Sequence, residues 1–327
     1  TRLDRKETRF LPFNKGDADE GAGNPVVPGK HSTHYIWEEI LQKDMLLRII
    51  REFMFVDDEG KMIFPRYHQL RAVLRCEKDV QEQGIGGRYL IWHSAGSGKT
   101  KTIAWLAKRM INHPDVNTVI EISDRNVIDG QLARELQNVD GKRGVAQHID
   151  TTSQDLLTKL NAGQYIIVTT LQKFRYILNE IKRYENRKYV IIIDEAHSST
   201  AGKSMSRALE MLTGKSLSEA IVLDDLYDDL EDEQAQLLKN SNAIKNTKNV
   251  SYFAFTATPK TETIELFGTR TENGKKYFDK YSMKQAIEEH FILNPLQCYS
   301  SYKDYYHIRK IRDDDTEYDS RRAQAAI

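Results

Sequence analysis

Residues 190–193 restrict the fold more than any other stretch, because Val, Ile, Ile and Ile follow one another without a polar residue. A strand with one wet face alternates apolar and polar side chains, whereas a strand inside a parallel sheet is buried on both faces and reads as a continuous apolar run. The run therefore predicts a central strand of a parallel sheet. Helices must then cover the faces of that sheet.

Similar short β-rich runs recur along the chain, and each is followed by a helix-compatible stretch. Strands that alternate with helices predict right-handed crossovers and an α/β fold, with a mostly parallel sheet covered by helices on both faces. Apolar residues at helical spacing predict helices over 35–55 and 67–81, after an irregular Gly- and Pro-rich arm over 1–34, and residues 283–291 form one amphipathic stretch. The strands are expected at Tyr89–Trp92, Thr118–Ile122, Tyr165–Thr169, Tyr189–Ile193 and Ser251–Thr256.

Bulk composition excludes several classes of protein. The 48 Lys and Arg residues balance 48 Asp and Glu residues, which argues against a generally basic nucleic-acid-coating protein but is compatible with a local basic groove. Cys76 and Cys298 lie far apart, so neither a structural disulfide nor a cysteine zinc site is expected, as suits a reducing cytosol. No run of 18 apolar residues is present, so we expect a cytoplasmic protein without a membrane span.

A glycine-rich loop over 93–100 joins the strand at 89–92 to a helical pattern. A strand, a tight turn and a helix N-terminus together direct backbone N–H groups and the helix dipole at an anion, which predicts phosphate binding. Lys99 is expected to reach the β- and γ-phosphates, and the Thr100 hydroxyl to bind Mg²⁺. His93 stands where the usual pattern has its first glycine. The expected phosphate-binding residues are Gly96, Ser97, Gly98, Lys99 and Thr100.

Carboxylates follow the central strand at its C-terminal end, where ligands of parallel sheets bind. Asp194 is expected to hold the Mg²⁺ hydration shell, and Glu195 to orient or deprotonate the attacking water. His197 could couple the γ-phosphate to a neighbouring element, or it could be a capping or packing histidine. Thr256 and Thr258 offer hydroxyls that could relay the nucleotide state, although an ordinary turn at a strand end also uses such residues.

Three stretches, 93–100, 194–197 and 256–259, resemble in this order motifs I, II and III of superfamily II helicases and translocases. Further stretches narrow the resemblance to one group within this superfamily. They are residues 9–16, residues 35–39 and the Trp-His pair that enters the loop. That group is the motor-and-nuclease (restriction, R) subunit of type I restriction-modification enzymes, and the resemblance covers nearly the whole chain.

The resemblance implies a RecA-like P-loop domain that binds ATP with Mg²⁺ and pumps double-stranded DNA before cleavage. It implies methyltransferase and specificity subunits as partners in the cytosol of a prokaryote. Residues 65–69 resemble the adenine-reading segment of the family, so Gln69 would bond the adenine edge and Arg66 or Tyr67 would stack on the ring. Contacts to the DNA backbone are expected from Arg125, Thr169, Thr170 and Lys173.

The resemblance also suggests a division of the chain. Residues 1–60 would be an arm and helix that link from a nuclease domain, 61–268 the first motor domain with an acidic insertion over 213–248, and 269–327 a linker toward a second RecA-like domain. We find neither a nuclease constellation before residue 60 nor an arginine-finger motif after Thr258. We therefore expect the chain alone to bind ATP but to hydrolyse it slowly, since such an arginine contributes about 10³–10⁵ in rate.

Two other functions stay open. The three motifs would also suit another superfamily II helicase that acts on DNA or RNA. A non-enzymatic role is also compatible with them, in which nucleotide binding gates the docking of a partner.

Overall fold

The computed structural model describes residues 2–3, 6–7, 11–17, 21–57, 59–123, 134–136, 139, 146–148, 165–170, 187–196, 249–271 and 274–294. The chain divides into two compact units, Thr1–Phe291 and Ile292–Ile327. In the second unit the described residues are 292–294, and all the helices and strands named below belong to the first unit.

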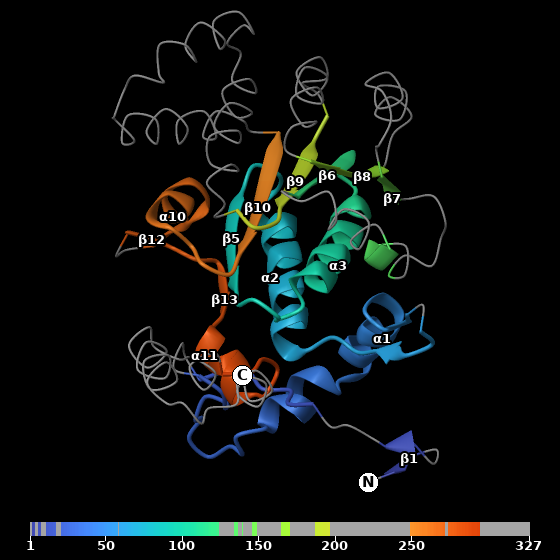
Figure 1. Ribbon diagram of the computed structural model, residues 1–327, viewed down its shortest axis with the longest axis vertical. Coiled ribbons are helices and arrows are strands. Elements are labelled where there is room, and N and C mark those ends of the chain that lie inside the picture. Colours follow the sequence, from blue (N-terminus) through green and yellow to red (C-terminus); the bar gives the residue numbers. More distant parts are fainter. Residues whose placement is uncertain are drawn as a thin grey trace, which may run out of the picture. The chain divides into compact units, whose positions relative to one another are not determined.

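A seven-stranded sheet, ordered β13-β5-β10-β9-β6-β8-β7, forms the centre of the first unit (Figure 1). Every neighbouring pair of strands in it is parallel, which confirms the expected α/β fold. The five strands expected from the sequence are present, with ends that differ by at most one residue. The strands are β5 (Arg88–His93), β6 (Thr118–Ser123), β7 (Ala146–His148), β8 (Tyr165–Thr170), β9 (Tyr189–Ile193), β10 (Val250–Thr256) and β13 (Asp279–Tyr281).

Strand β9 lies in the middle of this sheet and is buried along its whole length, as its apolar run predicted. Ile191 lies opposite Ile120 of β6 on one side and Tyr252 of β10 on the other. Parallel strands bring their C-terminal ends to one edge of the sheet, so the residues that come after β5, β9 and β10 meet there.

Helices α2 (Tyr67–Gln83) and α3 (Lys99–Ile111) pack side by side against the sheet (Figure 1). Helix α3 contacts β6, β8 and β9, and its apolar face, which includes Trp105, is fully buried. The short helix α10 (Thr261–Phe267) contacts β5 and β10, and α11 (Met283–Glu288) comes after β13. Helix α2 begins at the residue expected and ends two residues beyond the expected end.

The single helix expected over 35–55 is wrong. A π-helical turn, Ile36–Ile40, is separated from α1 (Lys43–Glu52) by Gln42, whose extended backbone starts the second helix. Helix α1 is joined to α3, because Glu52 pairs with Arg109 of α3 at 2.9 Å. The other described strands form two-stranded pairs: β1 (Arg2–Leu3) with β2 (Lys6–Glu7), β3 (Phe55–Val56) with β4 (Met62–Ile63), and β11 (Thr269–Thr271) with β12 (Gly274–Lys276).

The sheet continues past residue 268, where the sequence suggested the end of the motor domain. Strand β13 pairs with β5, so that Tyr281 lies opposite His93 at the entry of the phosphate loop. Helix α11 comes next within the same compact unit, which ends at Phe291. Residues 274–291 are thus part of the structure that carries the phosphate loop.

Candidate functional site

The phosphate loop leaves β5 at His93 and enters α3 at Lys99. Gly96 and Gly98 have φ angles of 73° and 81°, a left-handed conformation that glycine adopts without steric cost. A Cβ added at Gly98 would lie 2.7 Å from Nε2 of Gln69, so a side chain at this position would strain the backbone and displace the Gln69 amide. The loop therefore depends on glycine at both positions.

Several donors of this loop have no hydrogen-bond acceptor among the described residues. The Ser97 hydroxyl is buried and unpartnered, and the N–H groups of Gly98 and Lys99 belong to the open N-terminus of α3. Buried donors without partners are rare in native proteins, and a phosphate group would satisfy all of them. The loop thus fits the phosphate ligand that the sequence predicts.

Lys99 and the carboxylates after β9 meet at the C-terminal edge of the sheet. The Lys99 ammonium lies 3.3 Å from Oε1 of Glu195. Glu195 has a φ of 50°, which is uncommon for a residue with a side chain and is a kind of strain found often at functional sites. Its N–H donates to Oδ1 of Asp194 at 2.9 Å. The structure therefore brings together three of the four residues expected to be catalytic.

Burial and the neighbouring Glu195 charge raise the pKa of Asp194 to about 6, although Lys99 opposes the shift. A bound divalent cation would favour the ionised form of such a carboxylate. No group of three or more His, Cys, Asp or Glu residues able to hold a metal occurs in the described part of the chain. That is compatible with Mg²⁺, which commonly uses one or two carboxylates, substrate phosphates and water. Asp194 and the half-buried Thr100 fit this pattern.

A cavity of about 790 Å³ opens beside the start of α3. Arg66 and Gln69, two of the three residues expected to read adenine, line it together with Gly98 and Thr100. Tyr67 does not line it; the Tyr67 ring packs edge-on to Phe13 at 5.4 Å and lines a second cavity with Arg71. Arg66 is therefore the side chain in place to stack on a base.

Gln69 is already engaged in this structure. Its Oε1 accepts from the Arg66 N–H at 2.9 Å, and its Nε2 donates to the Gly98 carbonyl at 3.0 Å. The Arg66 guanidinium lies 3.6 Å from the ring centre of Phe291. A base that entered the cavity would have to share or replace these contacts.

Several other residues of this cavity were given no role by the sequence. Phe13, Phe64 and Phe291 supply its aromatic walls, and Lys101 and Glu135 form an ion pair at its rim. Phe13 stands in the stretch 9–16 that carried the family resemblance, so that signal was present but was not interpreted as binding.

The turn after β10 lies next to the Asp-Glu pair. The Ala196 N–H donates to the Phe255 carbonyl at 3.0 Å, which joins the end of β9 to the end of β10. Thr256 is buried, and its Oγ1 accepts from the Thr258 N–H at 3.1 Å, whereas the Thr258 side chain is exposed. Thr256 and Thr258 are therefore placed within the same turn at the edge where a γ-phosphate would bind.

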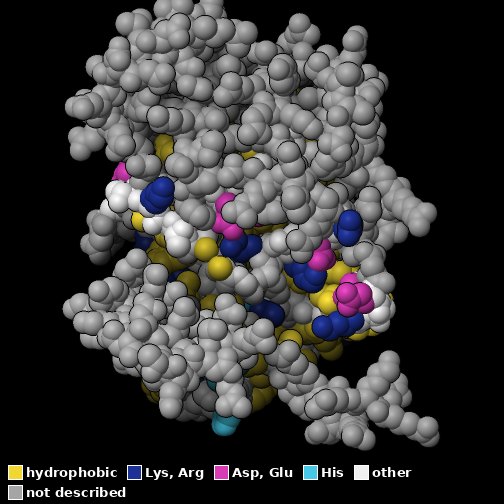
Figure 2. Space-filling model, viewed as in Figure 1, with side chains coloured by type: hydrophobic (Ala, Val, Ile, Leu, Met, Phe, Trp, Pro, Cys, Tyr) yellow, Lys and Arg dark blue, Asp and Glu magenta, His cyan; other side chains and the backbone are white. Residues whose placement is uncertain are grey.

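The expected DNA-contact residues are not assembled by the described structure. Thr169 is only 2 % exposed, and this burial argues against a direct contact with a DNA phosphate. Thr170 ends β8, but its side chain is not described, and His197, Arg125 and Lys173 lie outside the described residues. On the face shown in Figure 2, the visible Lys and Arg side chains alternate with Asp and Glu. That face has no basic stripe among its described side chains.

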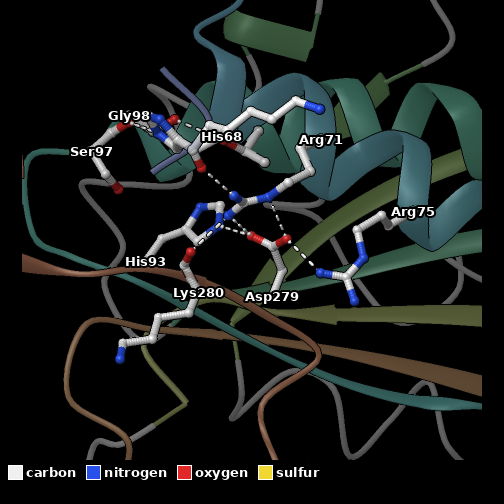
Figure 3. Close-up of polar contacts among 10 residues, drawn as sticks. His68, Arg71, Arg75, His93, Ser97, Gly98, Asp279 and Lys280 are labelled. Carbon is white, nitrogen blue, oxygen red and sulfur yellow. Dashed lines mark hydrogen bonds and ion pairs between the residues drawn. The ribbon is translucent and has the colours of Figure 1, made fainter. Parts of the chain in front are cut away.

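His93, the unusual first residue of the loop, is fully buried and lies 2.9 Å from Oδ1 of Asp279 (Figure 3). Asp279 belongs to β13, which the sequence assigned to a linker, and no local pattern links two residues so far apart.

No described helix is long and apolar enough to cross a membrane.

Comparison with known proteins gives one family. Residues 68–324, more than half of the chain, match the SWI2/SNF2 ATPase family. The type I restriction enzyme SsaAORF53P endonuclease subunit of Staphylococcus saprophyticus is 24 % identical over 296 residues, which cover 86 % of this chain and 26 % of that protein. The HindI endonuclease subunit of Haemophilus influenzae is 26 % identical over 273 residues, covering 76 % of this chain and 23 % of that subunit.

Among solved structures, a nuclease-deletion mutant of the Type ISP restriction-modification enzyme LlaGI in complex with a DNA substrate mimic gives a TM-score of 0.45 at 16 % identity. It covers 70 % of this chain and 21 % of that one. The relatives confirm the expected resemblance to type I restriction subunits. The chain spans only about a quarter of the length of the Staphylococcus saprophyticus and Haemophilus influenzae subunits.

Proposed function

Because the chain belongs to the SWI2/SNF2 ATPase family, we propose that it is the ATP-driven motor of a type I restriction endonuclease subunit, which translocates double-stranded DNA. The observation that carries the proposal is the meeting of Lys99 with Glu195 beside a loop whose donors lack partners among the described residues. A phosphate site with an acidic group in reach of it is what phosphoryl transfer to water requires.

Each role in phosphoryl transfer has a candidate residue at this site. The N–H groups of Gly98 and Lys99 and the Ser97 hydroxyl bind the phosphates, and the Lys99 ammonium compensates their charge. Glu195 orients and accepts a proton from the attacking water, and its ion pair with Lys99 is exchanged for a phosphate when the nucleotide binds. Asp194 and Thr100 would hold Mg²⁺, which supplies charge neutralisation on the phosphates when it is bound.

The remaining parts of the proposal rest on the relatives. Their names identify them as endonuclease subunits of type I restriction enzymes, so we propose double-stranded DNA as the track and methyltransferase and specificity subunits as partners, in the prokaryotic cytosol. A nuclease domain and a second RecA-like domain, both outside this chain, would complete the enzyme. Arg125, Thr170 and Lys173 remain candidates for the DNA backbone, whereas the burial of Thr169 makes it a weaker one.

The test begins with equilibrium binding of a fluorescent ATP analogue, with Mg²⁺, to the chain and to Lys99→Ala. Loss of the ammonium should weaken binding at least tenfold, since a buried charged contact to phosphate is worth more than about 1.4 kcal/mol. Lys78→Ala is the matched control, because Lys78 is an exposed lysine of α2 whose partner in the described structure is Glu82, at 3.7 Å. Equal binding by wild type and Lys99→Ala would overturn the ATP-site assignment.

The second measurement is phosphate release with and without nucleic acid. We expect slow hydrolysis that double-stranded DNA accelerates and that Lys99→Ala abolishes. Acceleration by RNA instead would favour another superfamily II helicase. Nucleotide binding without any hydrolysis, in a protein that also contains the second RecA-like domain, would favour the docking role.

A further inference from the structure

Two neighbouring side chains of α2 hold the phosphate loop by its carbonyl oxygens. His68 Nε2 donates to the Ser97 carbonyl at 3.0 Å, and Gln69 Nε2 donates to the Gly98 carbonyl at 3.0 Å. We propose that His68 is a positioning residue for ATP, which directs the amide groups of the loop at the phosphates through its hydrogen bond to Ser97. The inference rests on the proposed ATP-binding function and adds to it a residue outside the loop.

The geometry of the peptide bond gives this hydrogen bond its effect. In a trans peptide, the carbonyl of one residue and the N–H of the next point in opposite directions. When His68 binds the Ser97 carbonyl, the N–H of Gly98 must point away from α2. The next peptide is held by more than one donor, because the Gly98 carbonyl accepts from Gln69 Nε2 at 3.0 Å and from the Thr102 N–H and hydroxyl at 3.3 Å. Gly98 is flexible, so without the His68 contact the peptide plane between Ser97 and Gly98 could rotate at little cost.

The His68 ring is itself held in place on both sides. It stacks on Tyr281 of β13 with ring centres 3.6 Å apart and an interplanar angle of 12°. The His93 ring meets its edge at 5.3 Å. His68 is buried, and because a carbonyl can only accept, its Nε2 must carry the proton. Burial and the neighbouring His93 hold the pKa of His68 well below its usual range, so the ring is neutral and keeps this tautomer.

Strand β13 supplies a rigid base for the stack through Asp279 (Figure 3). The Asp279 carboxylate is fully buried and accepts from both Arg71 (2.9 and 3.0 Å) and Arg75 (3.0 Å) of α2. It also bonds His93 at 2.9 Å, at the entry of the loop. The Ser94 N–H donates to the Tyr281 carbonyl at 3.0 Å, which ties the first part of the loop to the same strand.

If His68 had only a structural role, its loss would lower the stability of the protein without a specific effect on nucleotide affinity. Two substitutions separate the cases. His68→Phe keeps the aromatic stack on Tyr281 but removes the donor, whereas His68→Gln loses the stack but can place an amide Nε2 near the position of the ring nitrogen. The matched control is Tyr89→Phe in β5, which deletes a hydrogen bond of 2.7 Å to Asp79 of α2 without touching the loop.

We expect His68→Phe to bind the fluorescent ATP analogue about tenfold more weakly, because one buried hydrogen bond is lost and the Ser97 carbonyl is left without its donor. His68→Gln should bind within about threefold of wild type, and Tyr89→Phe should bind as wild type does. The thermal midpoints of His68→Phe and Tyr89→Phe should be similar. Wild-type affinity in His68→Phe would overturn the inference, as would equal weakening in the Phe and Gln variants.

Amide hydrogen exchange in the absence of nucleotide gives a second, independent measurement. The Ser94–Thr100 segment should exchange faster in His68→Phe than in wild type, and at the wild-type rate in Tyr89→Phe. If wild type itself fails to bind the analogue, the proposed ATP function fails, while exchange still decides whether His68 orders the loop. Unchanged exchange in His68→Phe would refute the positioning role whatever the ligand is.

Discussion

Removing the Asp279 carboxylate should be the most costly single change that leaves every candidate catalytic group in place. Asp279 is fully buried and accepts two hydrogen bonds from Arg71, one from Arg75 and one from His93. Asp279→Asn keeps the size of the side chain but replaces one acceptor oxygen with a donor and removes the charge. The half-buried Arg71 guanidinium then loses its carboxylate partner and keeps its hydrogen bonds to the Lys15 and Lys280 carbonyls. Breaking a buried ion pair from one side costs about 3–5 kcal/mol.

That cost is large beside a total stability of about 5–15 kcal/mol for a typical domain. Urea unfolding followed by circular dichroism should show the midpoint of Asp279→Asn about 1 M or more below that of wild type. Asp79→Asn is the control, since Asp79 is half-buried and accepts a bond from Tyr89; about 1 kcal/mol is expected there. A double-mutant cycle of Asp279→Asn with Arg71→Met should give a coupling energy of at least about 2 kcal/mol.

The pH dependence supplies a further check on the same carboxylate. Burial alone would raise the pKa of Asp279, but Arg71 and His93 outweigh burial and hold the pKa well below its usual range. A lowered pKa in the folded state means that the stabilisation is complete above the unfolded value of about 3.9 and is lost as pH falls through the folded value. The stability difference between wild type and Asp279→Asn should thus be equal at pH 6 and pH 8. A difference under about 1 kcal/mol, or one that changes between those pH values, would contradict the assignment of Asp279 as an ionised, buried partner of Arg71.

The site yields three further testable outcomes. Glu195→Gln should retain ATP binding but lower the rate of single-turnover hydrolysis by about 10²–10⁴, measured as phosphate release, and an unchanged rate would remove Glu195 from the proton transfer. Gly98→Ala should weaken binding of the ATP analogue, since φ is 81° and the Cβ would displace the Gln69 amide 2.7 Å away; unchanged binding would show that the loop adapts. The lowered pKa of His68 means that the unfolded chain binds more protons below about pH 6.5, so this residue makes stability fall with falling pH by up to about 1.4 kcal/mol per unit. Between about pH 6 and pH 5 the slope of unfolding free energy should be shallower by about 1 kcal/mol per unit in His68→Phe, and equal slopes would contradict the burial of a neutral ring.

The sequence predicted best those elements whose signal is local and strong. The β9 run is uniformly apolar, and β5 and β10 are each followed by a recognisable turn, so their positions could be predicted within one residue. The phosphate loop and the Asp-Glu pair were found for the same reason, because the chemistry needs fixed residue types at the C-terminal ends of strands in one parallel sheet. Parallel strand order then places Lys99 near Glu195, as the structure shows.

Elements without such a signal were missed. Strand β13 has three residues, two of them charged, and it forms only because β5 offers an open edge far away in the sequence. The expected helix over 35–55 failed for a related reason. Apolar residues recur at helical spacing across Leu41 and Gln42, yet Gln42 takes an extended backbone, and tertiary contacts decide which residues are buried on each side. Periodicity alone cannot show such a break.

The histidine at position 93 can be explained only when the sequence motif and the tertiary contacts of the loop are considered together. The usual glycine at this position has no side chain, and a buried imidazole in its place needs a partner for its N–H and a space free of backbone. Strand β13 supplies the partner, since Asp279 binds the ring, and Tyr281 lies opposite His93 in the sheet. The same strand stacks Tyr281 on His68, which holds the other end of the loop at Ser97. The departure from the usual motif is therefore compensated by contacts from a strand far away in the sequence, and a phosphate loop with histidine at its start should depend on that strand for its affinity.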